Sequence, residues 1–332
     1  MKREEVLKRL GFTVPDCKKK RVIIASDVNC EADDPFAIMH HLLTPSFEVK
    51  GIIACHFEYV PRSMEAMAKQ RGEGESAEES GYVAGRFATM ERSYAEGELI
   101  LKLAGIDDVP MLRGAKREIS DINDLPESEG ADFIIEEALR DDPRPLYVCM
   151  LGGETDLAIA YLKKPEIAKK VIAVGILGGV YPEGGWEFNL VQDIKAVNTL
   201  FQSPMEFWQI PMNVYGSTEI SFAELVRYIR PCGEIGKWLV GQMLEFQQRT
   251  ASADRDWPNP EMWSIGDNPT VGVLLQGEGN RTWHTCKAPR VGDDCTYTED
   301  PDGKEIRVYD SYAVRMTLSD QIAKLQLCYG DA

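Results

Sequence analysis

The sequence predicts an α/β fold in which one mainly parallel, doubly wound sheet carries helices on both faces. Short β-branched apolar runs alternate with segments of helical periodicity along the 332 residues. The apolar runs contain few polar residues, as expected of strands that are buried on both faces. A hydrophobic content of 44% and the absence of internal repeats favour one large core. We therefore expect residues 1–332 to form a single Rossmann-like domain.

The elements are assigned in chain order from their periodicity. Strands are expected at 21–26, 49–54, 145–151, 171–177 and 208–214, with shorter ones at 271–275 and 305–309. Helices are expected at 35–43, 91–105, 130–140, 154–163, 193–202, 219–229, 235–250 and 312–327. In the segment 154–163, for example, Leu157, Ala158 and Leu162 share one helical face, and Pro165 ends the helix. Residues 60–90 are rich in Glu, Gly and Ser, and we expect them to form an exposed insertion.

Charge and cysteine usage limit the class of partner. The formal charge of −17 and the pI near 4.8 argue against a nucleic acid, because phosphate binding requires a basic face. The eight cysteines form no CxxC pair, and the N-terminus has no apolar segment of the secretory type. The longest apolar run is too short to cross a membrane. These features predict a cytoplasmic protein that binds a small molecule or a cation.

Acidic residues are concentrated directly after the first expected strand. Within eight positions the chain places Asp27, Asn29, Glu31, Asp33 and Asp34. One explanation is a solvated acidic loop in which Asp33 or Asp34 caps the next helix ahead of Pro35. That explanation accounts for one acid and leaves the others without a role.

Two further explanations involve a cation. An EF-hand loop is excluded because its sixth position should be Gly and is Ala32, and its twelfth should be Glu and is Ile38. The remaining explanation is a cation site at the carboxyl end of a parallel strand, where the ligands of such sheets bind. A hard divalent ion would offset the repulsion among the acids.

Other segments after expected strands supply the oxygen donors that such a site needs. Gly152 and Gly153 follow one strand and let the backbone approach a ligand. Glu187 and Asn189 follow the next strand, and Asp267 precedes an apolar run. We therefore expect these residues to meet the acidic loop at one edge of the sheet.

These motifs resemble the nucleoside hydrolase family of the inosine–uridine-preferring type. Residues 27–34 read D-V-N-C-E-A-D-D, against the family pattern D-x-D-P-G-x-D-D. The resemblance continues through VPMLRGA, LGGETDLAIA and EFNLVQDIKAV, and it spans roughly residues 20–310. It implies the nucleoside hydrolase fold, a nucleoside as the small-molecule partner, and a homodimer or homotetramer.

The resemblance also implies roles for individual residues. Calcium would be held by Asn29, Asp34, the backbone carbonyl of Leu151, and Asp267. Asp33 would be the general base that activates the metal-bound water. The ribose would be bound by Asp33, Glu187, Asn189 and Glu58. The implied activity is a calcium-dependent N-ribohydrolase that cleaves the N-glycosidic bond of a nucleoside or modified nucleoside to free base and ribose.

The chain departs from the family pattern in the metal-binding loop and where it would hold the base. Asn29 replaces a metal-binding Asp, Glu31 replaces a Gly, and Gly266 replaces a His that precedes the late Asp. Candidates for the base pocket or the leaving-group acid are His56, Trp186, Tyr215 and Trp263. Two alternatives therefore stay open, a nucleoside- or sugar-binding protein with impaired catalysis and a hydrolase of another ribosyl or glycosyl linkage.

Overall fold

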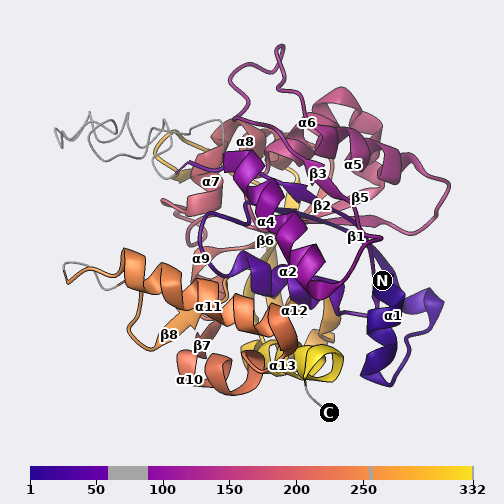
Figure 1. The fold of residues 1–332 in the computed structure, drawn as a ribbon. Coiled ribbons are helices and arrows are strands. Elements are labelled where there is room, and N and C mark those ends of the chain that lie inside the picture. The colour runs from indigo at the N-terminus through magenta and orange to yellow at the C-terminus, as the bar shows by residue number, and fades with distance from the viewer. Residues whose placement is uncertain (59–88, 254–256, 331–332) are drawn as a thin grey trace.

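A computed structural model describes residues 1–58, 89–253 and 257–330 of the chain. The protein is built around a central eight-stranded sheet (Figure 1). The strand order is β3-β2-β1-β4-β5-β6-β12-β9. All neighbouring pairs are parallel except β12 and β9. The expected α/β fold with a mainly parallel sheet is therefore confirmed. The expected insertion at 60–90 lies almost entirely outside the described residues.

The strands of the main sheet are β1 (Lys20–Ser26), β2 (Phe47–Ala54), β3 (Met111–Arg113), β4 (Leu146–Met150), β5 (Val171–Ile176), β6 (Glu206–Ile210), β9 (Arg281–Lys287) and β12 (Glu305–Tyr312). Two small antiparallel sheets pair β7 (Glu219–Ser221) with β8 (Met262–Ser264), and β10 (Arg290–Val291) with β11 (Tyr297–Thr298). Single turns of other helix types are η1 (Lys8–Leu10), η2 (Asp16–Lys18), η3 (Pro165–Lys169), η4 (Leu225–Ile229) and η5 (Glu278–Asn280).

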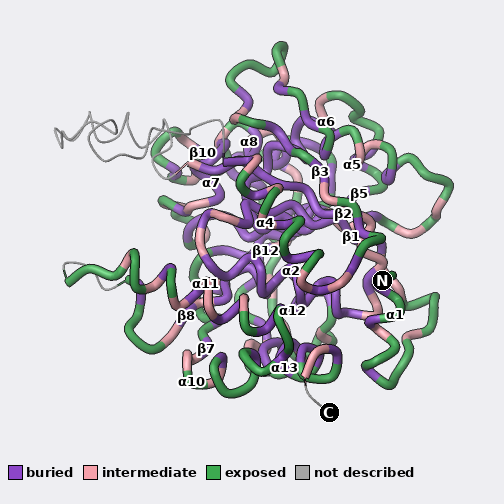
Figure 2. Tube along the Cα trace, viewed as in Figure 1, coloured by how far each residue is buried: buried purple, intermediate pink, exposed green. Residues whose placement is uncertain are grey.

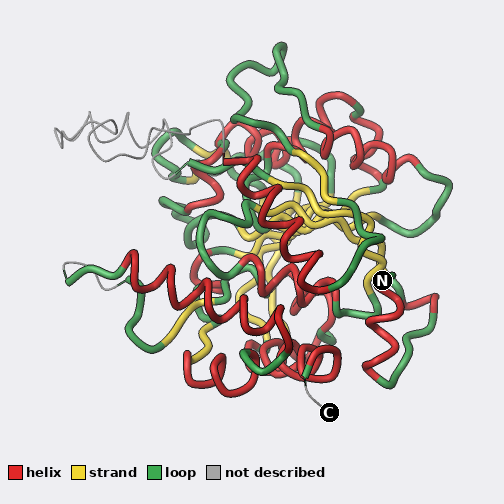
Figure 3. The backbone as a smooth tube through the Cα atoms, in the orientation of Figure 1, coloured by secondary structure: helices red, strands yellow, loops and turns green. Residues whose placement is uncertain are grey.

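Helices cover both faces of the sheet (Figure 3). One face packs against α2 (Asp34–Leu42), α4 (Thr89–Ala104), α11 (Gly233–Thr250), α12 (Pro269–Leu275) and α13 (Val314–Tyr329). The other face packs against α5 (Glu129–Leu139), α6 (Thr155–Lys163) and α8 (Ile194–Gln202). Shorter helices are α1 (Arg3–Leu7), α7 (Phe188–Gln192), α9 (Met212–Tyr215) and α10 (Phe222–Glu224). Within the described residues, none of the helices has both the length and the apolar character needed to cross a bilayer.

The alternation of side chains along β1 explains this layering. Val22 and Ile24 belong to the core under α2 and α13, whereas Ile23 and Ala25 belong to the core under α5 and α6. Successive residues of a strand point to opposite faces, so a continuous apolar run buries both. Figure 2 shows the result, a buried sheet between partly exposed helices.

Three of the sequence-based element assignments were wrong. The segment expected as a strand at 271–275 is the helix α12, because a short apolar run does not distinguish a buried strand from a buried helix, and Pro269 begins the helix. The strand expected at 208–214 ends at Ile210, and the chain then forms α9. The helix expected at 219–229 begins with the strand β7.

The chain order of the strands reverses at β1. Strand β2 pairs with one edge of β1 and strand β4 pairs with the other. The carboxyl ends of β1 and β4 are therefore neighbours, with the connections leaving in opposite directions. Ligands of open α/β sheets bind at such a switch point, and the acidic loop after β1 lies there.

Candidate active site

Three carboxylates from distant parts of the chain meet beside this switch point. Oxygen atoms of Asp33, Asp34 and Asp267 all lie within 4.8 Å of one another, and the three residues are buried. Asp33 and Asp34 start α2, whereas Asp267 lies in the turn before α12. The structure thus brings together the acids that the sequence placed in one site.

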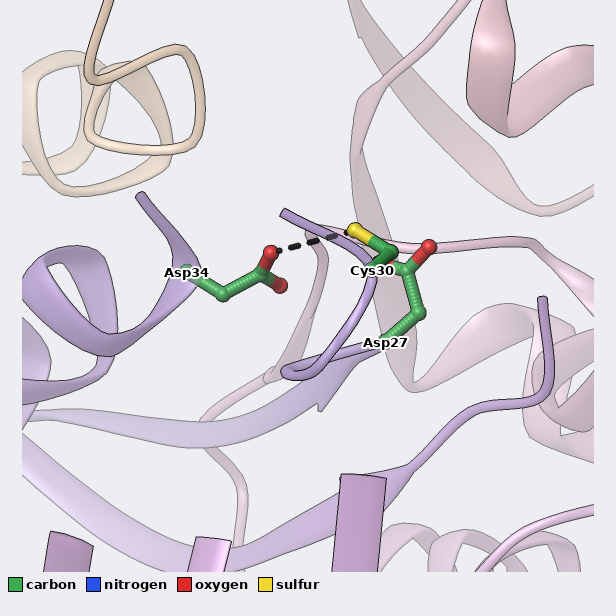
Figure 4. A group of neighbouring side chains, drawn as sticks. All are labelled: Asp27, Cys30 and Asp34. Carbon is green, nitrogen blue, oxygen red and sulfur yellow. Dashed lines mark hydrogen bonds between the residues drawn. The ribbon is translucent and has the colours of Figure 1, made fainter. Parts of the chain in front are cut away.

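A second group shares Asp34 and includes a thiol (Figure 4). Ligand atoms of Asp27, Cys30 and Asp34 also lie within 4.8 Å of one another. Asp34 accepts hydrogen bonds on both carboxylate oxygens, Oδ1 from the Ser26 hydroxyl and Oδ2 from the Cys30 thiol at 3.5 Å. Figure 4 shows the Asp34 carboxylate directed toward the Cys30 sulfur. Asp34 therefore lies between the two groups.

Asn29 is oriented by an acid that the sequence analysis did not identify. The Asn29 amide nitrogen donates a hydrogen bond to Glu96 Oε2 of α4. Because a carboxylate only accepts, this contact directs the amide nitrogen to Glu96 and leaves the amide oxygen as the atom available to a cation. Burial raises the pKa of Glu96, and the negative charge of Asp34 raises it further. Glu96 thus adds a further carboxyl group directly beside Asn29.

The turn after β4 approaches the acidic loop closely. Asn189 donates from its amide nitrogen to the carbonyl oxygens of Leu151 at 2.6 Å and Ile176 at 3.0 Å, which leaves its amide oxygen available. A Cβ atom at Gly152 would lie 2.6 Å from Asp27 Oδ1 and 2.8 Å from the Asp27 backbone nitrogen. Only glycine fits there, so the Leu151 carbonyl and the Asp27 loop are held side by side.

Gly152→Ala should therefore lower the free energy of unfolding by about 1–3 kcal/mol, the usual cost of overpacking a buried site. The matched control is Gly241→Ala in α11, where an added Cβ meets no atom within 4 Å. That substitution should be stabilising by about 0.5–1 kcal/mol, because Ala favours a helix interior over Gly. Chemical denaturation of both variants checks the pair. An equal change in the free energy of unfolding for the two variants would show that Gly152 does not lie close to Asp27.

Glu187 is held by four hydrogen bonds. Its Oε1 accepts from the Asn189 backbone N–H at 3.2 Å and the Tyr215 hydroxyl at 2.9 Å, and its Oε2 accepts from the backbone N–H groups of Gly178 at 2.8 Å and Leu190 at 2.9 Å. A carboxylate offers about four acceptor positions, and these contacts use them. In this arrangement Glu187 caps α7 and positions Tyr215, so direct ribose binding by Glu187 would require one of these bonds to open.

Tyr215 fills the space beside Gly266. A Cβ atom at Gly266 would lie 3.1 Å from Tyr215 Cδ2 and 3.4 Å from Asp33 Oδ2. Burial raises the pKa of the Tyr215 hydroxyl well above its usual value, and the charge of Glu187 raises it further. Tyr215 is therefore a neutral hydrogen-bond donor next to Asp33, where the family resemblance expected a histidine.

Burial and mutual repulsion raise the pKa values of the acidic side chains in the site. Burial raises the pKa of Asp33 to about 7, and Asp34 raises it further, while backbone N–H groups of Gly266 and Asp267 oppose the shift. Burial also raises the pKa of Asp27 and Asp267 well above the usual range, and the charge of Asp34 adds to both shifts. Side chains of this kind favour either a proton or a bound cation over the free anionic state.

His56 and Glu58 follow β2, the strand that pairs with β1 on the side away from β4. His56 is buried, and neither ring nitrogen has a hydrogen-bond partner among the described residues. Burial lowers the pKa of His56 to about 4, so the ring is neutral at pH 7 and a poor proton donor to a leaving base. The backbone of Glu58 is anchored by Gln192, through bonds of 2.7 Å and 3.1 Å.

The two tryptophans expected in a base pocket are placed differently. Trp263 is 3% exposed and packs against Phe246 and Trp257, with ring centroids 5.8 Å and 5.6 Å away. The structure therefore places Trp263 in an aromatic cluster of the core and not on an open pocket wall. Trp186 is 43% exposed and directly precedes Glu187, so its ring is accessible close to the site.

Comparison with known sequences identifies relatives over most of the chain. A family model described as inosine-uridine preferring nucleoside hydrolase matches residues 22–324. The pyrimidine-specific ribonucleoside hydrolase RihA of Salmonella typhimurium is 27% identical over an alignment of 162 residues, and the match covers 46% of this chain and 50% of that protein. The matched region thus spans about half the length of the curated relatives.

Solved structures share the fold over nearly the full chain. A purine-preferring ribonucleoside hydrolase from Gardnerella vaginalis superposes with a TM-score of 0.71 at 19% identity, covering 93% of this chain and 99% of that one. A plant nucleoside hydrolase superposes with a TM-score of 0.69 at 18% identity, covering 94% and 99%. At these identities the likeness establishes the fold alone.

Proposed function

We propose that this chain, which belongs to the inosine-uridine preferring nucleoside hydrolase family, is a metal-dependent N-ribohydrolase that releases the base from a nucleoside or modified nucleoside. The observation that carries the proposal is the meeting of Asp33, Asp34 and Asp267 beside the switch point of the sheet. The relatives leave the base undecided, because one is named pyrimidine-specific and another purine-preferring. A cytoplasmic location and a homodimer or homotetramer stay predictions.

The donor atoms fit a hard divalent cation, and we propose calcium. Asn29, Asp34, Asp267 and the Leu151 carbonyl would supply only oxygen, the donor that calcium prefers. Asp33 Oδ1 is buried without a hydrogen-bond partner among the described residues, as expected of a site completed by a ligand. When bound, the cation would orient the ribose hydroxyls and make nearby water more acidic.

Each side chain then has a distinct part in the reaction. Asp33 takes a proton from the water that attacks the anomeric carbon, and its raised pKa suits a general base near neutral pH. The Asn189 amide oxygen accepts a hydrogen bond from a ribose hydroxyl. The remaining carboxylates stabilise the positive charge that develops on the sugar ring as the N-glycosidic bond breaks. Tyr215 orients Glu187 and limits the space next to the base.

The direct test is release of free base from a panel of purine and pyrimidine ribonucleosides in the presence of calcium. We expect turnover of at least one ribonucleoside, and a loss of up to about 10⁴-fold for its 2′-deoxy counterpart, because buried polar groups built for a hydroxyl would lose their partner. No turnover of any ribonucleoside, combined with no binding of ribose, would exclude the proposal.

Tyr215→Phe should lower kcat/KM by about 10- to 100-fold, because it removes the hydrogen bond of 2.9 Å that orients Glu187. A hydrogen bond to a charged group contributes about 1.5–3 kcal/mol. Steady-state kinetics with the preferred nucleoside measure the effect. Tyr228→Phe, at a half-exposed ring on η4, is the matched control and should leave kcat/KM unchanged. An unchanged kcat/KM in the Tyr215→Phe variant would show that Tyr215 has no role in the reaction.

One observation favours the alternative of a nucleoside- or sugar-binding protein. The Tyr215 ring occupies the space beside Gly266, and the Tyr215 proton is directed to Glu187 and not toward a base. Leaving-group protonation would then lack a dedicated acid. Calorimetric titration with ribose and nucleosides separates the two functions, since tight binding without release of base supports the binding protein.

A further inference from the structure

We propose that Asp27, Cys30 and Asp34 form a second cation subsite, which takes a borderline transition ion such as Zn²⁺ in preference to Ca²⁺. It adjoins the oxygen-lined site of Asp33, Asp34 and Asp267 and shares Asp34 with it. The inference requires only these side chains and the fold, and it does not depend on the proposed hydrolase activity.

The local backbone brings the thiol to the two carboxylates. The Cys30 backbone N–H donates to the Asp27 carbonyl at 2.7 Å, which closes a tight turn directly after β1. Through this turn the thiol reaches Asp34, the first residue of α2, at an Sγ–Oδ2 distance of 3.5 Å. Figure 4 shows the three side chains converging from the end of β1, the loop and the start of α2.

The separation of sulfur and oxygen suits a tetrahedral ion. Zinc binds sulfur at about 2.3 Å and carboxylate oxygen at about 2.0 Å, so a tetrahedral angle places the two ligand atoms about 3.5 Å apart. The distance from Cys30 Sγ to Asp34 Oδ2 is 3.5 Å, and all three ligand atoms lie within 4.8 Å of one another. An ion could therefore be accommodated with small side-chain movements.

An independent sign of a missing ligand comes from Asp27. This side chain is 1% exposed, and its Oδ2 has no hydrogen-bond partner among the described residues. Gly152 closes the approach from β4, where even a methyl group would contact Asp27 Oδ1. A buried carboxylate oxygen without a donor is costly unless a proton or a cation binds it.

Sulfur decides which ion the subsite prefers. Calcium is coordinated by oxygen, whereas a thiolate favours zinc and similar ions. Binding would replace the Cys30 thiol proton with a metal–sulfur bond, and the proton would pass to solvent. The two carboxylates and the thiolate together would carry three negative charges, which a divalent ion largely offsets. Asp34 would then supply one oxygen to each ion.

Cobalt titration of the full chain tests the inference. Co²⁺ replaces zinc in many sites, and a cobalt–thiolate bond gives a charge-transfer band in the near ultraviolet. With calcium present in excess, we expect this band to grow to one equivalent of Co²⁺ and to disappear when Zn²⁺ is added. Absence of the band in the unaltered protein, or its removal by calcium alone, would overturn the proposal whatever the hydrolase assays give.

Substitutions of individual cysteines identify the thiol that gives the cobalt charge-transfer band. Cys30→Ser should abolish it, whereas Cys149→Ser, at a buried thiol in β4, and Cys17→Ser, at an exposed thiol, should retain it. Asp27→Asn should weaken cobalt binding while it keeps the band at saturation. Thermal unfolding confirms that each variant is folded. A band that survives Cys30→Ser would show that another thiol binds the ion and would contradict the assignment.

Discussion

Replacing Asp33 with Asn should lower kcat by about 10²- to 10⁴-fold, the usual contribution of a general base. The substitution keeps the size of the side chain but removes the carboxylate that accepts the proton of water. Asp33 lies at the start of α2 with its Oδ1 unpartnered among the described residues, so an amide fits without breaking a hydrogen bond to that atom. We therefore expect the variant to fold and to bind nucleoside. Steady-state kinetics and calorimetry measure the two properties separately.

Asp302→Asn is the matched control for this variant, because Asp302 is exposed and lies in a turn far from the site in sequence. Its kcat should equal that of the unaltered protein. An Asp33→Asn protein with full activity would show that another group takes the proton, and the mechanism proposed for this site would be wrong.

Calcium should increase the stability of the folded protein, and the gain should be larger at pH 7 than at pH 5. In the ion-free protein the pKa of Asp33 is about 7, whereas the usual value is 3.8. The folded state therefore binds more protons than the unfolded state between these pH values, and its stability falls as the pH rises through this window. A bound cation offsets the negative charge that Asp33 acquires as it loses its proton, so the ion stabilises the protein most at the higher pH. At a calcium concentration of 100 times Kd the gain should be about 2.7 kcal/mol.

Asp267→Asn should remove most of the calcium-dependent gain. The substitution deletes one carboxylate from the group formed with Asp33 and Asp34, which also relieves repulsion in the ion-free state. Without calcium, the variant should therefore be at least as stable as the unaltered protein at pH 7. Thermal and chemical unfolding with calcium or a chelator provide the measurement, again with Asp302→Asn as control. A calcium gain that is unchanged in the Asp267 variant would contradict the site.

The order of the parallel strands explains which parts of the site could be predicted from the sequence. Polar residues after parallel strands gather at one edge of the sheet, so Asp33, Asp34 and the Leu151 turn could be placed together once β1 and β4 were recognised. Asp267 was placed at the same edge because it precedes an apolar run, and only its role as a metal ligand came from the family resemblance; that run was taken for a strand and forms α12. Short apolar runs carry too little periodicity to separate the two.

Contacts between distant side chains could not be predicted. Glu96 lies within a helix that has no local motif, and only the folded chain brings its carboxylate to Asn29. Of the four hydrogen bonds that hold Glu187, two come from the start of α7, which Glu187 caps, and one comes from Gly178. Only the fourth, from Tyr215 of α9, depends on how distant segments fold together. Trp263 illustrates the opposite error, because a tryptophan near an expected site is placed in the core by neighbours that the local sequence does not reveal.

The proposal that a cation and a ribose share the carboxylates at the β1–β4 edge is tested most directly by binding to the Asp33→Asn variant. A ribonucleoside is titrated calorimetrically into this variant with calcium and with a chelator. We predict binding with calcium and a loss of most of the affinity when the ion is removed. Equal affinity under both conditions, or no binding under either, would contradict the proposed site.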